Sequence, residues 1–237
     1  MQVFQTTEAL NKAVAEFIIT TAAKAIAARG RFTLALSGGQ TPEKLYSLLA
    51  EPAYSKQIQW DKTFIFWGDE RCVPLDDERN NAHLAKLLLL NKVNIPSSNI
   101  YRIPVNLSPP EAAKNYEKEI NNFFDNEAPR FDIILLGLGE NGHTASLFPH
   151  TKVLDEQAEA VRAVYLEEEK MFRVTMIAPM INHAHHILFL VTGENKAEIL
   201  EKILHTPDHP DNYPAQLIHP VDGKLHWYVD NAAARLI

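Results

Sequence analysis

The segment F-D-I-I-L-L-G-L-G-E-N-G-H-T-A-S-L-F-P, residues 131–149, combines a strand pattern with a glycine loop, and the rest of the chain can be interpreted from it. Residues 133–136 are all apolar, which predicts a short strand buried on both faces. The glycines that follow allow the backbone to turn sharply and to approach a ligand closely: Gly137, Gly139 and Gly142. His143 then stands at the carboxyl end of the strand, where open α/β sheets bind ligands, so its imidazole is a candidate general base. The alternative is that His143 only caps a helix that begins after the loop.

Length and composition limit the class of protein. The chain has 237 residues, and we expect residues 1–237 to form a single domain. The net charge is −7 and there is no run of lysine or arginine, so we expect no nucleic-acid partner. Cys72 is the single cysteine, which excludes an intrachain disulfide and fits a reducing compartment. Without a signal-peptide pattern or a membrane-length apolar run, we expect a cytoplasmic protein with no membrane partner.

A second glycine turn follows the apolar segment Phe32–Leu36, which predicts another buried strand. The turn reads Ser37-Gly38-Gly39-Gln40-Thr41, and Pro42 suits the first turn of a helix that Thr41 would cap. Exposed N–H groups and the helix dipole at such a place favour an anion, above all phosphate. The alternative is a tight turn whose glycines serve only the backbone geometry.

Charged residues follow the next predicted strand, Thr63–Gly68. Asp69, Glu70 and Arg71 would lie at its carboxyl end, where a site is expected. The guanidinium of Arg71 can bind a phosphate or carboxylate in a forked geometry. The alternative is a solvated loop in which one of the acids pairs with Arg71 for little net stability.

The remaining segments alternate between helix and strand patterns. Further helices are expected at Thr6–Arg29, Asn81–Leu90, Ser108–Phe124, Pro179–Ala184, Asn195–Leu204 and Asn231–Leu236. Further strands are expected at Ile100–Ile103, Ala160–Tyr165, Phe172–Ile177, Ile187–Val191 and Leu225–Val229, with the acidic run Glu167–Glu169 as a solvated turn. The alternation predicts an α/β fold with one mostly parallel, doubly wound sheet and helices on both faces.

Several motifs together resemble the signatures of the 6-phosphogluconolactonase family. They are Ser37–Pro42, Trp67–Pro74 and Gly137–Pro149, with further matches at Arg173–Thr175, Val191–Gly193, Lys196, Pro214–Ile218, Trp227 and Asp230. The resemblance implies a three-layer α/β/α sandwich with a Rossmann-like sheet. It also implies hydrolysis of 6-phospho-D-glucono-1,5-lactone to 6-phosphogluconate in the oxidative pentose phosphate pathway. No metal and no organic cofactor are implied, and the expected partner is the small phosphosugar lactone, bound by a monomer or a small homo-oligomer.

A sister family, glucosamine-6-phosphate deaminase, shares the Ser-Gly-Gly turn and a Gly-His loop. That family typically has tyrosine where this chain has Arg71, and it continues past its histidine with a different sequence. This chain resembles the lactonase at both places, and the deaminase activity is kept as an alternative.

The resemblance implies a role for each candidate site residue. His143 is expected to act as the base on water. The 6-phosphate is expected on the turn formed by Ser37, Gly38, Gly39, Gln40 and Thr41, with Arg173 and Lys196 as cationic partners. Arg71 is either a third phosphate ligand or a stabiliser of the oxyanion, and Asp69 and Gly139 are further substrate contacts.

Asn141 is the one departure from the family pattern that bears on catalysis. The usual loop has aspartate two residues before the histidine, and this chain has Asn141. An amide can orient the imidazole by a hydrogen bond but brings no charge, so we expect His143 to be less basic than in relatives.

Other interpretations of the same motifs stay open at this point. Residues 137–142 match the dinucleotide pattern G-x-G-x-x-G, although Pro149 leaves little room for the helix that should follow. Ser37 stands in a relaxed nucleophile elbow, which would make the protein a serine hydrolase. A non-catalytic sugar-phosphate sensor would keep the phosphate turn without the chemistry. His183, His185 and His186 lack an acidic or sulfur partner nearby, so no metal site is expected.

Overall fold

The computed structural model describes residues 1–237, and its first long element is the helix α1, Thr7–Arg29. The hydroxyl of Thr6 accepts a hydrogen bond from the Ala9 N–H and so caps the helix start. Gly30 ends the helix at a φ of 75°, a left-handed conformation that glycine adopts without strain. The predicted bounds of this helix are therefore confirmed to within one residue.

A six-stranded sheet forms the centre of the molecule, in the order β1-β9-β8-β5-β2-β3. Its strands are β1 Gln2–Phe4, β2 Phe32–Leu36, β3 Thr63–Trp67, β5 Ile133–Gly137, β8 His186–Val191 and β9 Lys224–Asp230. All neighbouring strands run parallel, which confirms the predicted fold class. The chain winds from β2 outward to β3 and then crosses to β5 on the other side, so the direction of winding reverses between β2 and β5. Ligands of such sheets bind at this reversal, beyond the carboxyl ends of the two strands.

A second, smaller sheet has the order β4-β7-β6 and is antiparallel throughout. It consists of β4 Asp69–Arg71, β6 Val161–Leu166 and β7 Met171–Met176. The prediction that β6 and β7 belong to the single, mostly parallel sheet was wrong. Only the turn 167–170 separates them, and a parallel crossover needs a dozen residues or more, so they form a hairpin.

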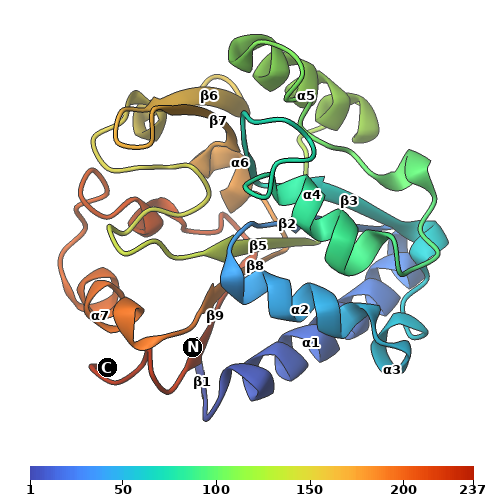
Figure 1. Ribbon diagram of the computed structural model, residues 1–237, viewed down its shortest axis with the longest axis horizontal. Helices are drawn as coiled ribbons and strands as arrows, with labels where there is room; N and C mark the ends of the chain where they lie inside the picture. Colours follow the sequence, from blue (N-terminus) through green and yellow to red (C-terminus); the bar gives the residue numbers. More distant parts are fainter.

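The helices surround the two sheets, and Figure 1 shows α5 at the top of the molecule, on the opposite side from α1. Helix α1 lies against β2 and β9 and contacts α2, whereas α5 packs on β6 and β7. The bounds of the other helices are α2 Gln40–Ala50, α3 Pro52–Ser55, α4 Asn81–Ala85, α5 Pro109–Phe123, α6 Ala178–Asn182 and α7 Ala197–His205. Helix α4 continues as a π-helical segment, Lys86–Leu90, within the range predicted for one helix.

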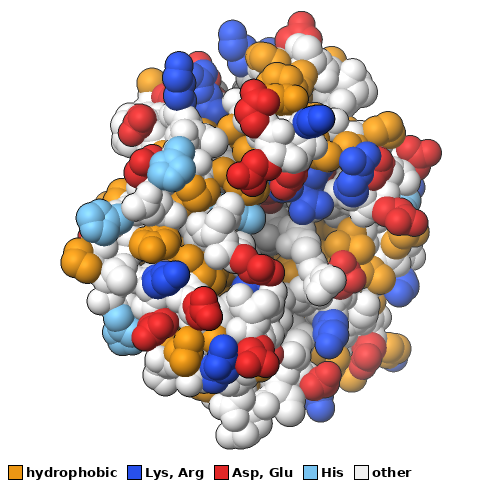
Figure 2. Space-filling view, turned by 60° about the vertical axis from the view of Figure 1, so that its left-hand side comes forward, with side chains coloured by type: hydrophobic (Ala, Val, Ile, Leu, Met, Phe, Trp, Pro, Cys, Tyr) orange, Lys and Arg blue, Asp and Glu red, His pale blue; other side chains and the backbone are white.

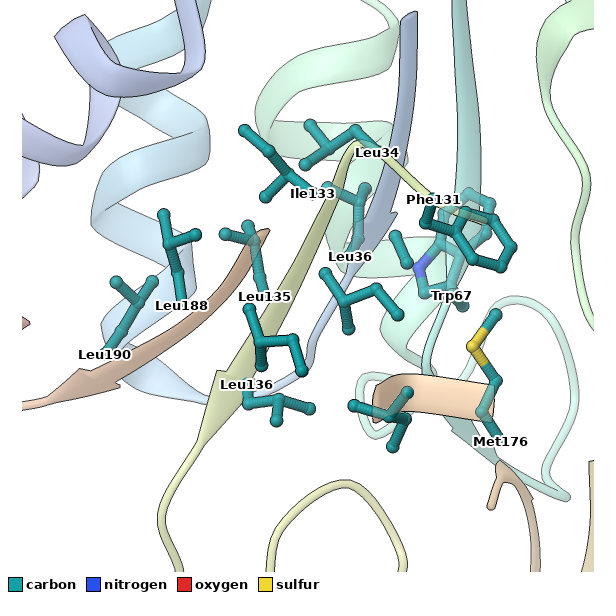
Figure 3. Close-up of a cluster of buried hydrophobic side chains, with 14 of the residues drawn as sticks. Leu34, Leu36, Trp67, Phe131, Ile133, Leu135, Leu136, Met176, Leu188 and Leu190 are labelled. Atoms are coloured by element: carbon teal, nitrogen blue, oxygen red, sulfur yellow. The ribbon is translucent and has the colours of Figure 1, made fainter. Parts of the chain in front are cut away.

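One hydrophobic cluster of 63 buried residues draws on both sheets and on the helices. Figure 3 shows part of it, with Met176 of the small sheet near Trp67 of the large sheet. Burial of these apolar side chains therefore holds the two sheets together. Such burial is the main favourable contribution to folding. No helix has the length and hydropathy needed to cross a bilayer.

Two predicted elements are absent, and strands β1 and β4 and the short helix α3 were not foreseen. Residues 100–103 form no strand, because they make a single bridge, from Ile100 to Ile65, before Pro104 ends any pairing. Residues 231–236 form turns, since a six-residue segment gains too few hydrogen bonds to offset the cost of helix nucleation. Strand β1 was not predicted, because its three residues carry no usable periodicity.

Candidate active site

A cavity of about 610 Å³ lies at the carboxyl ends of β2 and β5, where the winding reverses. Figure 2 shows the surface hollowed, with basic and acidic side chains interspersed around the depression. The structure brings almost all predicted site residues to this cavity: Ser37, Gly38, Gly39, Gln40, Thr41, Asp69, Arg71, Gly139, His143, Arg173 and Lys196. Asn141 is the exception, because it lies behind His143 and does not line the cavity. The volume suits a sugar phosphate.

The turn after β2 is held by Tyr46 of helix α2. The Tyr46 hydroxyl donates to the carbonyl of Ser37 at 2.6 Å and accepts from the Ser37 N–H at 3.1 Å. Helix α2 begins directly after Gly39, whose φ of 101° is one that L side chains rarely adopt. No side chain caps this helix start, so its N–H groups and its dipole are available to an anion in the cavity.

The prediction that Thr41 caps helix α2 was wrong. The helix begins at Gln40, one residue before Thr41, so Thr41 lies within its first turn. Its hydroxyl is 2.7 Å from the hydroxyl of Thr192, which follows strand β8. This hydrogen bond ties the helix start to a neighbouring strand and leaves the helix N–H groups uncapped.

The loop after β5 places the imidazole of His143 at the cavity. A Cβ atom at Gly139 would collide with the His143 ring, so glycine is required for the close approach of ring and backbone. The Gly139 N–H also donates to the carbonyl of His143 at 2.8 Å, and the Thr144 hydroxyl donates to the carbonyl of Gly137 at 2.8 Å. No helix follows the loop, because residues 144–147 form a tight turn closed by a bridge between Thr144 and Leu147. His143 therefore caps no helix, and the dinucleotide interpretation of the glycine pattern is wrong as well.

The hydrogen bonds of Asn141 determine the tautomer of His143. The backbone N–H of His143 donates to Oδ1 of Asn141 at 3.2 Å, which identifies that atom as the amide oxygen. Nδ1 of His143 lies 2.6 Å from the same oxygen. Since a carbonyl oxygen can only accept, Nδ1 carries the proton, and the neutral ring keeps its basic lone pair on Nε2.

The surroundings of His143 favour its neutral form. Burial, followed by the positive charges of Arg173, Lys196 and Arg71, lowers the pKa of His143 to about 3. The ring also stacks on Phe148, with centroids 3.9 Å apart. The imidazole is therefore unprotonated at neutral pH, which is the form that a general base needs.

The small sheet presents alternate side chains of β4 to the cavity. Asp69 and Arg71 line the cavity, whereas Glu70 points away and is buried. The Glu70 carboxylate accepts hydrogen bonds from the N–H groups of Arg71, Asn81 and Ala82, so it caps helix α4. The period of two along a strand explains why one acid belongs to the site and its neighbour to the scaffold.

Asp69 is a positioning group as well as a cavity residue. Its Oδ2 accepts from the hydroxyl of Ser146 at 2.7 Å and lies 3.7 Å from Nη1 of Arg173. Ser146 belongs to the loop that carries His143, so the Asp69 carboxylate connects that loop to the small sheet.

The two cavity arginines differ in their partners. Arg71 donates from Nη1 to the carbonyl of Arg79 at 2.8 Å, and its buried Nε has no hydrogen-bond partner. Arg173 is almost fully buried and pairs with the carboxylate of Glu169, with Nη2 2.6 Å from Oε2. Residues 167–169 form the exposed turn that was expected, and within it Glu169 also pairs with Arg173.

Lys196 reaches the cavity from a turn that is shaped by Asp230. The Gly193 N–H donates to both carboxylate oxygens of Asp230, at 3.1 and 3.2 Å, and this contact supports the short helical turn Glu194–Lys196. Nζ of Lys196 lies 3.9 Å from the carboxylate of Glu140 in the glycine loop, and burial lowers the pKa of Lys196. The ammonium group is thus held beside the loop that carries His143.

Several contributors to the site were not predicted: Tyr46, Asn81, Ser146, Glu169 and Thr192. For Asn81 the only trace in the sequence is Gly38. A Cβ at this position would collide with the Asn81 amide, so the glycine makes room for that side chain. The others act through contacts between distant segments, which no local pattern shows.

The geometry also bears on the serine and metal interpretations. The Ser37 hydroxyl donates to the carbonyl of Gly38 at 3.3 Å, and the His143 ring pairs with Asn141, so the two do not form a nucleophile–base pair. Nδ1 of His183 lies 2.8 Å from the carbonyl of Pro129. No cluster of three or more histidine, cysteine or acidic side chains has the geometry of a metal site.

Comparisons with known proteins agree on one family. The family model described as glucosamine-6-phosphate isomerases/6-phosphogluconolactonase matches residues 5–227. The chain is 43% identical to the 6-phosphogluconolactonase of Synechocystis over 91% of its length and 89% of that protein. It is 41% identical to the 6-phosphogluconolactonase of Haemophilus influenzae over 86% of this chain and 87% of that one. The structure of a 6-phosphogluconolactonase from Trypanosoma cruzi superposes with a TM-score of 0.86 at 29% identity, covering 98% of this chain and 94% of that one.

Proposed function

The chain belongs to the glucosamine-6-phosphate isomerase/6-phosphogluconolactonase family, and from this membership we propose that it hydrolyses 6-phospho-D-glucono-1,5-lactone to 6-phospho-D-gluconate, with His143 as the general base. One observation carries the proposal. A neutral imidazole, with its proton held on Nδ1 by Asn141, lines a cavity that also contains an uncapped helix start and four basic side chains. A base and an anion site in one pocket are what hydrolysis of a phosphorylated lactone requires.

In this mechanism Nε2 of His143 accepts a proton from water while the water oxygen attacks the lactone carbonyl carbon. The carbonyl oxygen becomes the oxyanion of a tetrahedral intermediate. The bond from this carbon to the ring oxygen then breaks, and the ring oxygen takes the proton from the imidazolium. A δ-lactone is an activated ester, so no covalent enzyme intermediate is needed, and a positioned base contributes about 10²–10⁴-fold to such a step.

The phosphate is assigned to the turn between β2 and α2. The uncapped N–H groups after Gly39 and the helix dipole favour a dianion there, and Lys196 and Arg173 add positive charge to the same cavity. The arriving phosphate also offsets the cations that lower the pKa of His143, so the base becomes stronger once substrate is bound.

Arg71 supplies the donor that the free protein leaves unused. Its buried Nε has no partner, and an unsatisfied buried N–H costs about 1–3 kcal/mol, which a substrate oxygen would recover. This donor either binds phosphate or stabilises the oxyanion, and both roles are compatible with its place in the cavity wall.

A coupled assay tests the proposed activity. Glucose-6-phosphate dehydrogenase generates the lactone in place, and 6-phosphogluconate dehydrogenase reports the product above spontaneous hydrolysis. We expect faster lactone loss with the protein present, and no ammonia release from glucosamine 6-phosphate in a parallel sample. Ammonia release would assign the chain to the deaminase activity, whereas phosphosugar binding without turnover would identify a sensor.

Other expectations stay predictions of this proposal. The contiguous hydrophobic cluster supports a single domain over residues 1–237. We further propose a cytoplasmic enzyme that acts as a monomer or small homo-oligomer without a metal or organic cofactor. Size-exclusion chromatography with light scattering measures the oligomeric state, and activity after exhaustive chelation measures the need for a metal.

A further inference from the structure

The phenyl ring of Phe148 lies in contact with the imidazole of His143. The two rings are stacked, with centroids 3.9 Å apart and planes 17° apart. A tight turn brings them together, because the bridge between Thr144 and Leu147 reverses the chain and returns Phe148 to His143. The hydroxyl of Thr151 then donates to the carbonyl of Phe148 at 2.7 Å, which holds the backbone at this position.

Phe148 is outside the cavity that His143 lines. Its side chain is buried, and with Asn141 it borders a separate hollow on the surface. The ring therefore contacts the imidazole without lining the space that a substrate would fill. An effect of Phe148 on catalysis must then pass through the side chains that it touches.

The chemical step proposed for His143 creates a positive charge in unfavourable surroundings. When Nε2 takes a proton from water, the imidazole becomes an imidazolium. The charged side chains that act on this ring are Arg173, Lys196 and Arg71, and all three are positive. Asn141 offers Nδ1 an amide oxygen but no negative charge. A group that favours the imidazolium over the neutral ring would therefore accelerate this step.

The face of an aromatic ring is such a group. It attracts a cation that lies within about 6 Å of the ring centroid, and most strongly where water is excluded. The imidazolium would lie on the ring of Phe148 at the stacking distance of 3.9 Å, whereas Cζ of Arg173 is 5.3 Å from the centroid. The charge of Arg173 is also offset by the carboxylate of Glu169 at 2.6 Å. The contact with Phe148 thus becomes stronger as His143 gains its proton.

From this arrangement, which rests on the proposed lactonase function, we propose that Phe148 is a positioning residue that holds the ring of His143 and stabilises the imidazolium formed during hydrolysis through its aromatic face. The proton still moves from water to Nε2 and then to the ring oxygen of the lactone, so no further chemical step is added. Because the phenyl ring does not line the cavity, its contribution falls on kcat and not on KM.

Site-specific incorporation of mono-, di- and trifluorinated phenylalanine at position 148 tests the proposal. Each fluorine withdraws electron density from the ring face and weakens its attraction for a cation, while the shape of the side chain changes little. We expect kcat for the lactone to fall with each fluorine, by about three- to tenfold for the trifluorinated ring, with KM unchanged. The same series at Phe189 is the matched control. That ring stacks on the uncharged ring of Trp227 with centroids 4.0 Å apart, so kcat should not respond to its fluorination.

A second measurement needs no turnover. The variant Asn141→Asp places a carboxylate beside Nδ1, which should raise the pKa of His143 into a range where the folded protein can be titrated. In this background, NMR titration of the imidazole should give a lower pKa with each fluorine at position 148, because a weaker ring face favours the imidazolium less. Fluorination at Phe189 should leave that pKa unchanged.

Other results would overturn the inference. A kcat that is the same throughout the series at position 148 would mean that Phe148 only packs against His143. A change confined to KM would mean that Phe148 acts through Arg173 on substrate binding. If the unmodified protein hydrolyses the lactone and kcat does not respond to fluorination, the role of Phe148 is rejected and the proposed function stands. If the unmodified protein does not hydrolyse the lactone, the proposed function fails, and a pKa of His143 that does not respond would reject the contact separately.

Discussion

The two sheets contribute different chemistry to the same cavity. The large parallel sheet contributes backbone geometry at its strand ends: the turn at Ser37, the uncapped start of α2 and the loop that holds His143. The small antiparallel sheet contributes charged side chains, among them Asp69, Arg71 and Arg173. Parallel strand ends carry loops and helix starts, whereas a short antiparallel pair projects alternate side chains from one face. Substitutions on the two sides should therefore affect different kinetic constants.

The largest effect is expected on the parallel-sheet side, from His143→Gln. Loss of the base should reduce kcat about 10²–10⁴-fold, with a much smaller change in KM. The coupled lactone assay measures both constants. Thermal melting and 6-phosphogluconate binding serve as controls for folding and for the phosphate site. Near-normal turnover in this variant would mean that another group activates the water.

Arg71→Met probes the small-sheet side. Removal of a charged donor should lower kcat/KM about 10–100-fold, the usual value of a hydrogen bond to a charged group. If the loss falls on KM, Arg71 binds phosphate, and if it falls on kcat, Arg71 stabilises the oxyanion. If kcat and KM are both unchanged, Arg71 takes no part in binding or catalysis. The proposed difference between the roles of the two sheets would then be weaker.

Asn141→Asp, on the side of the parallel sheet, places a negative charge next to Nδ1 of His143. A carboxylate beside Nδ1 favours the protonated imidazole, so the pKa of His143 should rise from about 3, by about one to three units. The base is active only when unprotonated, so the acidic limb of the kcat/KM profile should move to higher pH. In the wild type, the imidazole of His143 should stay unprotonated throughout pH 5–7. An acidic limb at the same pH in both proteins would contradict this account of the loop.

The smallest effects are expected from two tyrosines that hold strand ends in the same way. The hydroxyl of Tyr46 accepts a hydrogen bond from the N–H of Ser37 and donates one to its carbonyl. The hydroxyl of Tyr116 does the same for Trp67 at the end of β3. Tyr46→Phe and Tyr116→Phe should each lower the free energy of unfolding by about 1–3 kcal/mol, because buried backbone groups lose a partner. Only Tyr46→Phe should also raise KM, since its turn borders the phosphate site. Urea denaturation and the coupled assay measure the two effects, and equal KM values in both variants would argue against a phosphate at Ser37.

Prediction from sequence succeeded for every strand of the large sheet except β1 and for its glycine turns, but it assigned the strands of the small sheet wrongly. Strands β2 and β5 are short apolar runs followed by glycine, and such runs can be recognised without any knowledge of their neighbours. Strands β6 and β7 were recognised as strands, but they were assigned to the wrong sheet. Residues 166–171, which separate the two predicted strands, are already too few for a parallel connection, so this error could have been avoided.

The residues of the candidate site also include some that were predicted from sequence and some that were not. His143, Ser37 and Arg71 were identified because each stands directly after a strand pattern, next to glycine or to other charged residues. Glu169 was interpreted as solvated because its local sequence is an acidic run, which is most often an exposed turn. Its partner Arg173 lies on the following strand, and nothing in the run itself points to a buried cation.

The sequence by itself determined the parallel sheet, the glycine turns at its strand ends and the place of the candidate base His143, because these depend on local backbone freedom and on hydrophobic pattern. Only the tertiary structure decided which charges meet. The pairing of Arg71 with Arg173 across two strands follows from strand register, and the turn between β6 and β7 places Glu169 against Arg173. Register is set by contacts between segments about 100 residues apart, because a shift of one position would turn every side chain to the other face.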